Sequence, residues 1–196
     1  MYKGLYDQFA HWFHEDKGQV WFYSDPHFSD EEMKYLRKNY IGDEEQVKRI
    51  NSKVGKWDTI VILGDIGNRE WIKKIRGYKV LIMGNHDSGA SNYKRQNKFE
   101  AFDNHLFDEV YEGILAVSEK IILSHEPIDL PYALNIHGHD HSGWEKFDYP
   151  HVNMCAELIN YTPVSLSSII KSGVLKQIPD IHRITINGAT ERSKKK

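Results

Sequence analysis

The feature that most constrains the fold is a pair of uninterrupted apolar runs, each followed directly by glycine and polar residues. Residues 59–63 read T-I-V-I-L and end in Gly64-Asp65, and residues 78–83 end in the sequence G-N-H-D. Apolar runs of this length, bounded by turn residues, indicate buried strands. Helical patterns at residues 43–54 and 69–76 adjoin them, so the first half of the chain alternates strand and helix.

The second half of the chain is richer in strands. Short β-rich runs at residues 110–111, 114–117 and 120–123 are joined by the turns E-G and S-E, which predicts hairpins. Further strands are expected at residues 20–23, 134–136 and 151–155, and short helices at residues 30–37 and 166–170. Together these elements predict an α/β fold, a four-layer α/β/β/α sandwich with mixed sheets inside and helices outside.

The length favours one domain, because 196 residues with 40% hydrophobic side chains can bury a sizeable core. We assign this domain to residues 20–188. Residues 1–19 place aromatic and leucine side chains three and four positions apart, which predicts an amphipathic helix packed on the domain. The alternative for this stripe is a homodimer or partner surface. Residues 189–196 are expected to form a disordered tail, a solvated end in preference to a nucleic-acid arm.

Composition excludes several classes of protein. The single cysteine, Cys155, allows no intramolecular disulfide and no thiolate metal cluster, and is expected in the core. The net charge of -2 provides no overall basic field for nucleic acid. No apolar run approaches the roughly 18 residues of a membrane span, and the first residues do not read as a signal peptide. We therefore expect a cytoplasmic protein with no membrane partner.

Polar residues that bind metals or move protons follow five strand ends. The candidates are Asp25, His27, Asp65, Asn85, His86, Asp87, His125, His139 and His141. Ligands in open α/β sheets collect beyond the carboxyl ends of strands, although each group alone is also an ordinary turn signal. All but His86 and Asp87 are candidate ligands with oxygen or imidazole donors, which suit Mn²⁺, Fe²⁺, Zn²⁺ or Ni²⁺. Seven ligands are too many for one tetrahedral ion and fit two ions sharing a carboxylate.

In chain order, the blocks D-P-H, G-D-I-G-N, G-N-H-D, S-H and G-H-D-H resemble the pattern of the calcineurin-like metallophosphoesterase superfamily, including its small bacterial and phage members. The resemblance extends over residues 25–141. It implies two divalent metal ions, with Asp65 as the bridging carboxylate. The ligands implied for the first metal are Asp25, His27 and His141, and those for the second are Asn85, His125 and His139.

The resemblance also implies roles beyond the ligands. His86 is expected to face the substrate phosphate, and Asp87 to orient its ring. Asn68 is expected to contact the phosphate or a bridging water. Gly84 is expected to allow a sharp turn at the strand end. The polar loop at residues 88–98, with three basic side chains, is either solvated surface or a lid that attracts an anionic substrate.

The expected activity is two-metal hydrolysis of a phosphoester, first of all a nucleotide-like phosphodiester, with a metal-bridging water or hydroxide as the nucleophile. Manganese is the first expectation for the metal, with iron, nickel, zinc and magnesium as alternatives. A nuclease or a phosphomonoesterase, acting on nucleotides or phosphoproteins, is the alternative function. The third hypothesis is a scaffold protein without catalytic activity, and the presence of every motif residue argues against it.

Overall fold

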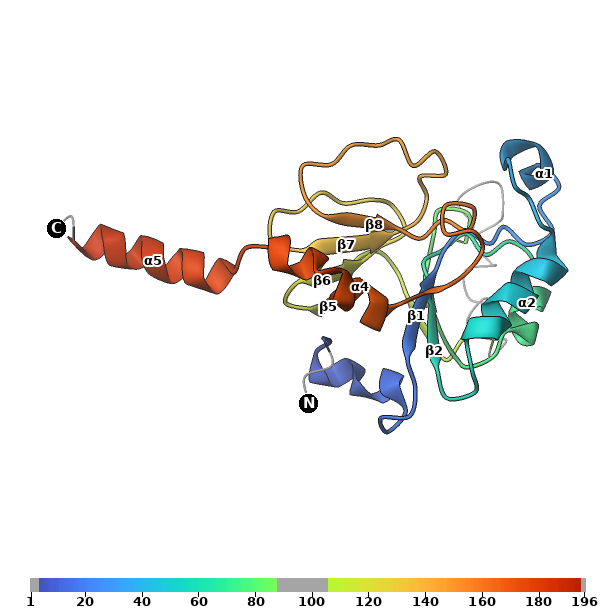
Figure 1. Cartoon of the computed structure of the whole chain (residues 1–196), viewed down its shortest axis with the longest axis horizontal. Coiled ribbons are helices and arrows are strands. Elements are labelled where there is room, and N and C mark those ends of the chain that lie inside the picture. The colour runs from blue at the N-terminus through green and yellow to red at the C-terminus, as the bar shows by residue number, and fades with distance from the viewer. Residues whose placement is uncertain (1–3, 88–105, 195–196) are drawn as a thin grey trace.

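The computed structural model describes residues 4–87 and 106–194, and two mixed β-sheets form its centre (Figure 1). The first sheet has the strand order β4-β3-β2-β1-β9 and the second the order β5-β6-β7-β8. In the first sheet, β1 to β4 are parallel and β9 is antiparallel to β1. In the second sheet, β5 and β6 are antiparallel, and β6, β7 and β8 are parallel. The strands are β1 (Val20–Tyr23), β2 (Thr59–Ile62), β3 (Tyr78–Ile82), β4 (Glu109–Tyr111), β5 (Leu115–Ser118), β6 (Ile121–Leu123), β7 (Leu134–His137), β8 (His151–Asn153) and β9 (Val164–Ser165).

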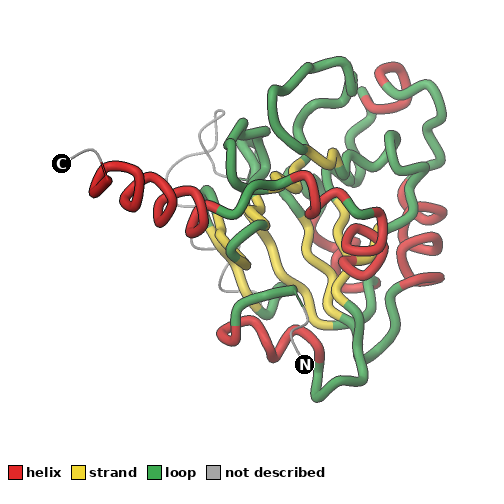
Figure 2. Tube along the Cα trace, turned by 60° about the vertical axis from the view of Figure 1, so that its left-hand side comes forward, coloured by secondary structure: helices red, strands yellow, loops and turns green. Residues whose placement is uncertain are grey.

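Helices surround the sheets and one of them extends away from the body (Figure 2). The α-helices are α1 (Met33–Leu36), α2 (Asp43–Lys53), α4 (Leu166–Ser172) and α5 (Ile181–Lys194). The 3-10 helices are η1 (Asp7–Phe13), η2 (Arg69–Lys74) and η4 (Val174–Gln177). Within the described ranges, no helix is both long and apolar enough to cross a membrane.

Side-chain alternation on the central strands creates two cores. Val61 and Leu63 lie in the core between the sheets, together with Leu123 and Ile136 of the second sheet. Ile60, on the opposite face of β2, packs in a second core that α2 and η2 cover. The α/β class with mixed sheets is confirmed. The expected four-layer α/β/β/α arrangement is not confirmed, because η1 and α4 contribute side chains to the core between the two sheets.

Several elements differ from the sequence prediction, and each difference has a local cause. β4 does not form a hairpin but pairs in parallel with β3 in the other sheet. Gly42 is the N-cap residue of α2, and Asp43, the first residue of the helix, accepts hydrogen bonds from the backbone N–H and hydroxyl of Ser29. The short strand β9 has no alternating pattern, because it consists of two residues.

The described parts of the segments outside the predicted domain take defined positions. Among residues 1–19, the structure describes η1, which buries Phe9, Trp12 and Phe13 against the core between the sheets. Trp12 also donates a hydrogen bond to Glu109. Residues 189–194 of the predicted tail form the end of α5. The loop at residues 88–98 and residues 195–196 lie outside the described residues.

Candidate metal centre

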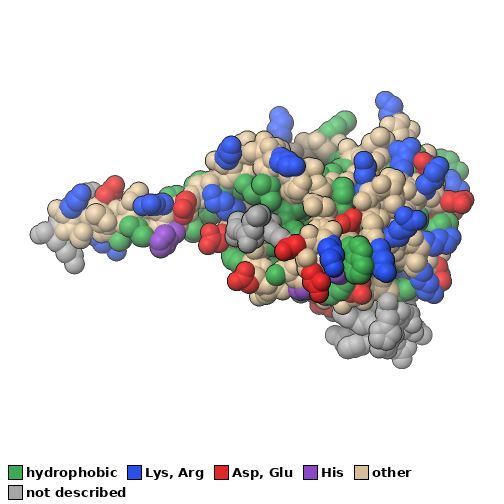
Figure 3. Space-filling view, turned by 60° about the horizontal axis from the view of Figure 1, so that its bottom comes forward, with side chains coloured by type: hydrophobic (Ala, Val, Ile, Leu, Met, Phe, Trp, Pro, Cys, Tyr) green, Lys and Arg blue, Asp and Glu red, His purple; other side chains and the backbone are tan. Residues whose placement is uncertain are grey.

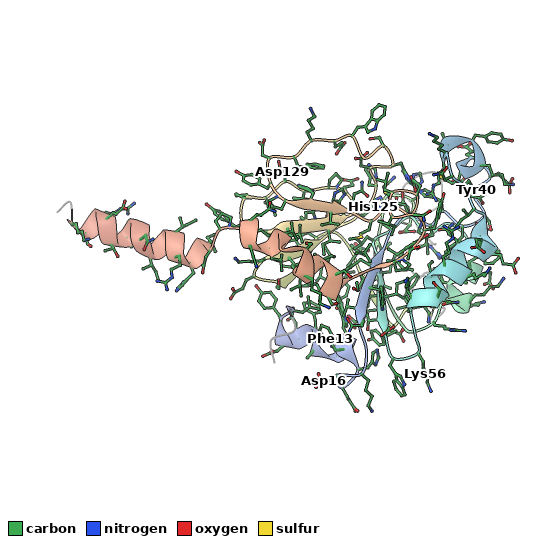
Figure 4. All side chains as sticks on the ribbon, viewed as in Figure 1. Phe13, Asp16, Tyr40, Lys56, His125 and Asp129 are labelled. Atoms are coloured by element: carbon green, nitrogen blue, oxygen red, sulfur yellow. The ribbon has the colours of Figure 1, made fainter. Side chains whose placement is uncertain are left out.

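The predicted ligands converge because their strands end at the same edge. Asp25 and Asp65 follow the parallel strands β1 and β2, whose residues pair in register from Val20 with Thr59 onward. His125, labelled in Figure 4, follows β6 of the second sheet. Its Nδ1 donates a hydrogen bond of 2.8 Å to the carbonyl of Leu63, which directly follows β2 of the first sheet. The two sheets therefore meet at the candidate site.

One group of donor atoms gathers around His125. Its Nε2 lies 2.8 Å from Asn85 Oδ1, 3.1 Å from His139 Nδ1 and 3.4 Å from Asp65 Oδ2. Neighbouring donors about 2.1 Å from one divalent ion are separated by roughly 3 Å in octahedral geometry. The observed separations match this spacing, so these four residues fit a single ion.

A second group of donor atoms adjoins the first and shares Asp65. His27 Nε2 lies 3.8 Å from Asp25 Oδ1 and 3.7 Å from Asp65 Oδ2. His141 Nε2 lies 3.5 Å from the same oxygen of Asp25. All seven predicted ligands thus fall into two adjoining groups, and a single carboxylate belongs to both.

The hydrogen bonds of Asp25 leave one of its oxygens without a partner. Oδ2 accepts from the Ser24 hydroxyl at 2.5 Å, from the His139 backbone N–H at 2.9 Å and from the Cys155 thiol at 3.3 Å. Oδ1 is buried and has no hydrogen-bond partner, and the same holds for His27 Nε2 beside it. Buried polar atoms without partners are costly. Oxygen and imidazole donors facing one another in this way fit a divalent cation.

The backbone at these ligands is held in an uncommon conformation. Asp25, His27, Asp65 and His139 all have positive φ angles, between 45° and 66°. Such angles cost energy for residues with a Cβ atom and cluster at functional sites. Four of the seven candidate ligand side chains are therefore directed into the site by a strained backbone at the strand ends.

Glycines allow the closest approaches in the site. A Cβ atom on Gly84 would lie 2.3 Å from Asp65 Oδ1, and one on Gly138 would lie 2.2 Å from Asp25 Oδ2. Gly84 does not have a positive φ angle. The chain does turn here, since the backbone N–H of Asp87 donates a hydrogen bond of 3.2 Å to the Gly84 carbonyl. The close contact with Asp65, and not a left-handed backbone, is what requires glycine.

Comparison with known proteins agrees with this geometry. The sequence profile of the family described as calcineurin-like phosphoesterase matches residues 18–161. The chain belongs to this family. Membership confirms the resemblance drawn from the five motif blocks and supports phosphoester hydrolysis as the general activity.

Two further relatives and one solved structure are similar to this phosphoesterase chain. An uncharacterized protein of Methanocaldococcus jannaschii is 31% identical over 178 residues, which cover 78% of this chain and 90% of the relative. The gene 66 protein of Mycobacterium phage L5 is 38% identical over 82 residues, 35% of this chain and 39% of that protein. The crystal structure of a protein of unknown function from Aquifex aeolicus has a TM-score of 0.62 at 25% identity, and covers 79% of this chain and 99% of that one.

The other predicted residues of this phosphoesterase lie around the candidate ligands. His86 has a side chain that is 59% exposed, with Nε2 3.9 Å from Asp65 Oδ2, so it faces the open side of the site. Asp87 is buried and accepts hydrogen bonds from the backbone N–H groups of Asp65, Ile66 and Gly84. These bonds join two strand-end loops, and none of them goes to His86, which Asp87 was expected to orient.

In the part of the chain that the structure describes, the side chain of Asn68 caps a helix and does not point to a substrate role by itself. Its side-chain oxygen accepts a hydrogen bond from the Glu70 backbone and caps η2. Its amide nitrogen donates to the Ser29 hydroxyl at 3.3 Å. The expected contact of Asn68 with substrate stays a prediction.

Sequence reasoning missed the residues that support the ligands. His141 Nδ1 lies 2.6 Å from Glu157 Oε1, and Arg37 Nε lies 3.3 Å from the other oxygen of Glu157. Arg37 also donates to the Asp25 carbonyl at 2.6 Å. Cys155 is buried, as expected, but its thiol contacts Asp25 as well as the core. No motif in the sequence marks Arg37, Glu157 or Ser24.

The charges of the site shift the pKa values of its ligands in opposite directions. Burial would raise the pKa of Asp25, but the His27 imidazole 3.8 Å away, the hydrogen bond from Ser24 and the charge of His125 hold that pKa well below its ordinary value. Burial would lower the pKa of His125, but its contact with Asp65 and the charges of both aspartates raise it to about 9. Burial likewise opposes the effect of Glu157, which raises the pKa of His141. The site therefore stabilises the ionised form of Asp25 and the protonated forms of His125 and His141 at the same time.

Proposed function

We propose that this chain hydrolyses phosphodiesters with two divalent ions held by seven side chains. The observation that carries the proposal is the position of Asp65, which belongs both to the group around His125 and to the group around Asp25 and His27. A carboxylate with two oxygens can bridge two ions about 3.5–4 Å apart. The proposed ligands of the first ion are Asp25, His27, Asp65 and His141, and those of the second are Asp65, Asn85, His125 and His139.

The bound ions would supply an acidified water molecule and positive charge for the phosphate oxygens. The remaining chemistry falls to the chain. His86 is exposed beside the site, 5.7 Å from the ring of His27 between ring centroids. We assign His86 to the substrate, where its imidazolium protonates the departing oxygen. Asp87 keeps the loops of Asp65 and Gly84 in register, so the ligands and His86 hold their relative positions.

The donor set supports Mn²⁺ as the working ion, because four imidazoles, two carboxylates and one amide combine nitrogen and hard oxygen ligands. A purely oxygen-lined site would favour Mg²⁺ or Ca²⁺. Nickel, zinc and iron are the competitors that an assay must include. A nucleotide-like diester is the proposed substrate class, because an alkoxide leaving group requires the proton that His86 offers.

The proposal is tested by hydrolysis of a matched pair of chromogenic substrates, bis(p-nitrophenyl) phosphate and p-nitrophenyl phosphate. The chain is stripped of metal and reloaded separately with Mn²⁺, Ni²⁺, Zn²⁺, Fe²⁺ or Mg²⁺. The diester should be the better substrate, and Mn²⁺ should give the highest rate. Preference for the monoester would replace the diesterase assignment by a phosphatase, and failure of every metal with both substrates would refute hydrolysis.

The role of His86 has a separate test. His86→Gln should retain both ions and lower kcat on a ribose or alkyl phosphodiester by roughly 10²–10⁴. The loss should be much smaller on the nitrophenyl diester, since a nitrophenolate leaves without a proton. His182→Gln, at an exposed histidine in α5, is the matched control and should change neither rate. Equal losses on both substrates would contradict protonation by His86.

A further inference from the structure

A groove lies between η1 and α4, away from the candidate metal centre. It has a volume of about 960 Å³, and its apolar walls include Leu5 and Phe13 on one side and Leu166 and Ile170 on the other. Gly18, which also lines it, precedes β1, whereas Asp25 and His27 of the candidate metal centre follow the end of that strand. The groove is therefore separated from the site by the length of the strand, about 13 Å for four residues.

Among the described elements, α5 is the longest helix that buries no residue. It has 14 residues and none of them is buried. Ile181, Ile184 and Ile186 are 50%, 46% and 45% exposed. A helix of this length is marginal in water without tertiary packing, and three exposed isoleucines in two turns are unusual for a solvated helix. The sequence of α5 therefore suits a helix that packs against another surface.

The size of the groove matches the apolar part of α5. Two helical turns are about 11 Å long and about 10 Å across with side chains, which corresponds to roughly 800 Å³. The three isoleucines all fall within two turns. Ile184 and Ile186, two positions apart, point to nearly opposite sides of the helix. A helix that is apolar on two sides suits a groove with two apolar walls.

The charges of the two surfaces are complementary. Asp7, Glu15 and Asp16 line the groove together with one basic residue, Lys171. The charged residues of α5 are Arg183, Glu191, Arg192 and Lys194. Figure 3 shows the face with η1 turned forward, where hydrophobic side chains lie among acidic and basic ones, while α5 extends to the left with charged side chains of both signs exposed. The acidic residues Asp7, Glu15 and Asp16 thus lie at the groove in which the more basic helix α5 would dock.

The connection to α5 keeps the helix away from the groove of its own chain. Ile178 is 3% exposed in the core between the sheets, and its carbonyl accepts a hydrogen bond from Lys120. Only Pro179 and Asp180 separate it from α5, and Asp180 accepts hydrogen bonds from the first turn of that helix. Figures 1 and 2 both show α5 extending away from the body. Folding back would require the anchored segment to unpack.

We propose that two copies of this chain form a dimer in which α5 of each copy occupies the groove between η1 and α4 of the other. The exchange is reciprocal, so it closes with two-fold symmetry and buries both apolar surfaces. The metal centres lie at the other end of β1 and keep their ligands from a single chain. The groove is a docking site for α5 of a second copy.

Two single substitutions and their mixture test this arrangement. Ile184→Asp places a charge on the helix, and Ile170→Asp places one on a groove wall; Ile170 is 39% exposed. The wild-type chain should be a dimer by sedimentation equilibrium, and each variant should raise the dimer dissociation constant at least about tenfold. Ile114→Asp, at an isoleucine that is 60% exposed and does not line the groove, is the control and should leave the dimer intact.

Mixing the two variants distinguishes reciprocal exchange from other contacts. A mixed dimer unites the intact helix of the Ile170→Asp chain with the intact groove of the Ile184→Asp chain, so mixing should restore dimers that neither variant forms alone. Circular dichroism of each variant checks that it is folded. A monomeric wild-type chain would overturn the proposal, and so would a dimer that persists in Ile170→Asp or a mixture that stays monomeric. Hydrolysis by the metal-loaded wild-type chain is measured separately, because a monomer with activity would refute the dimer alone.

Discussion

Metal binding to this chain should release a proton from His125. Its Nδ1 donates to the carbonyl of Leu63, which can only accept, so Nδ1 carries a hydrogen. Its Nε2 lies 2.8 Å from Asn85 Oδ1 and 3.4 Å from Asp65 Oδ2, and both atoms are oxygen acceptors. Without a cation, the favourable form of His125 is therefore the imidazolium, in which a proton takes the place of the ion.

The size of the effect follows from the pKa of His125, which the surrounding carboxylates raise to about 9 against the cost of burial. At pH 7.5 a group with this pKa is more than about 90% protonated. An imidazole must be neutral to bind a metal. Loading the second ion should therefore release about one proton, and the apparent affinity should rise about tenfold for each pH unit between pH 7 and pH 9.

Isothermal titration calorimetry with Mn²⁺ measures the proton count directly. The titration is repeated at pH 7.5 in buffers with different ionisation enthalpies, and the slope of the observed heat against that enthalpy is the number of protons released. His86→Gln is the matched control and should give the same slope, since we assign no metal to His86. A slope of zero for the wild-type chain would refute the imidazolium reasoning.

The same proton sets the stability of the metal-free protein. The folded-state pKa of His125 lies above its unfolded value near 6.5. Its contribution to the free energy of unfolding is therefore complete below pH 6.5 and is lost as the pH rises through about 9. The thermal midpoint in a chelator should fall between pH 6.5 and pH 9.5, while the metal-loaded protein should show a smaller change. A midpoint in chelator that is equal at both pH values would contradict this linkage.

Three further substitutions test the site. Asp65→Ala should lower the metal content, measured by plasma mass spectrometry, at both sites together, and one fully retained ion would contradict a shared carboxylate. Gly84→Ala brings a Cβ atom to 2.3 Å from Asp65 Oδ1, so calorimetry should show a loss of about 1–3 kcal/mol; Gly188→Ala, in open space, should not. Glu157→Gln should weaken the ion bound by His141 about 10–100-fold in a metal titration, and an unchanged affinity would exclude this support.

The convergence of the proposed ligands could be predicted from sequence, because each of them lies within a few residues of the end of an apolar run. The edge where β1, β2 and β3 end is fixed by parallel pairing in register, so residues two or three positions past a strand end meet there. Asp65 and Asn85 are examples. Periodicity and turn chemistry were sufficient to define these positions.

The supporting residues could not be predicted in this way. Glu157 is 16 positions from His141 and 120 from Arg37, and the three meet only through the packing of separate loops. The reason for Gly84 was also hidden, because its contact is with a side chain 19 positions away. Helix type depends on packing as well. The aromatic stripe of residues 1–19 is compatible with either helical geometry, and the helix observed within its described residues is the seven-residue 3-10 helix η1.

The site joins the two sheets, and this has a mechanical consequence. Asp25, His27, Asp65 and Asn85 follow strands of the first sheet, whereas His125, His139 and His141 follow strands of the second. Each proposed ion has ligands from both, so a loaded ion would cross-link two halves that otherwise adhere through apolar contact. Separating the sheets would then require breaking coordination bonds at one end while the core opens from the other. Opening of the core would therefore require metal release, so bound ions would make the parting of the two sheets rarer.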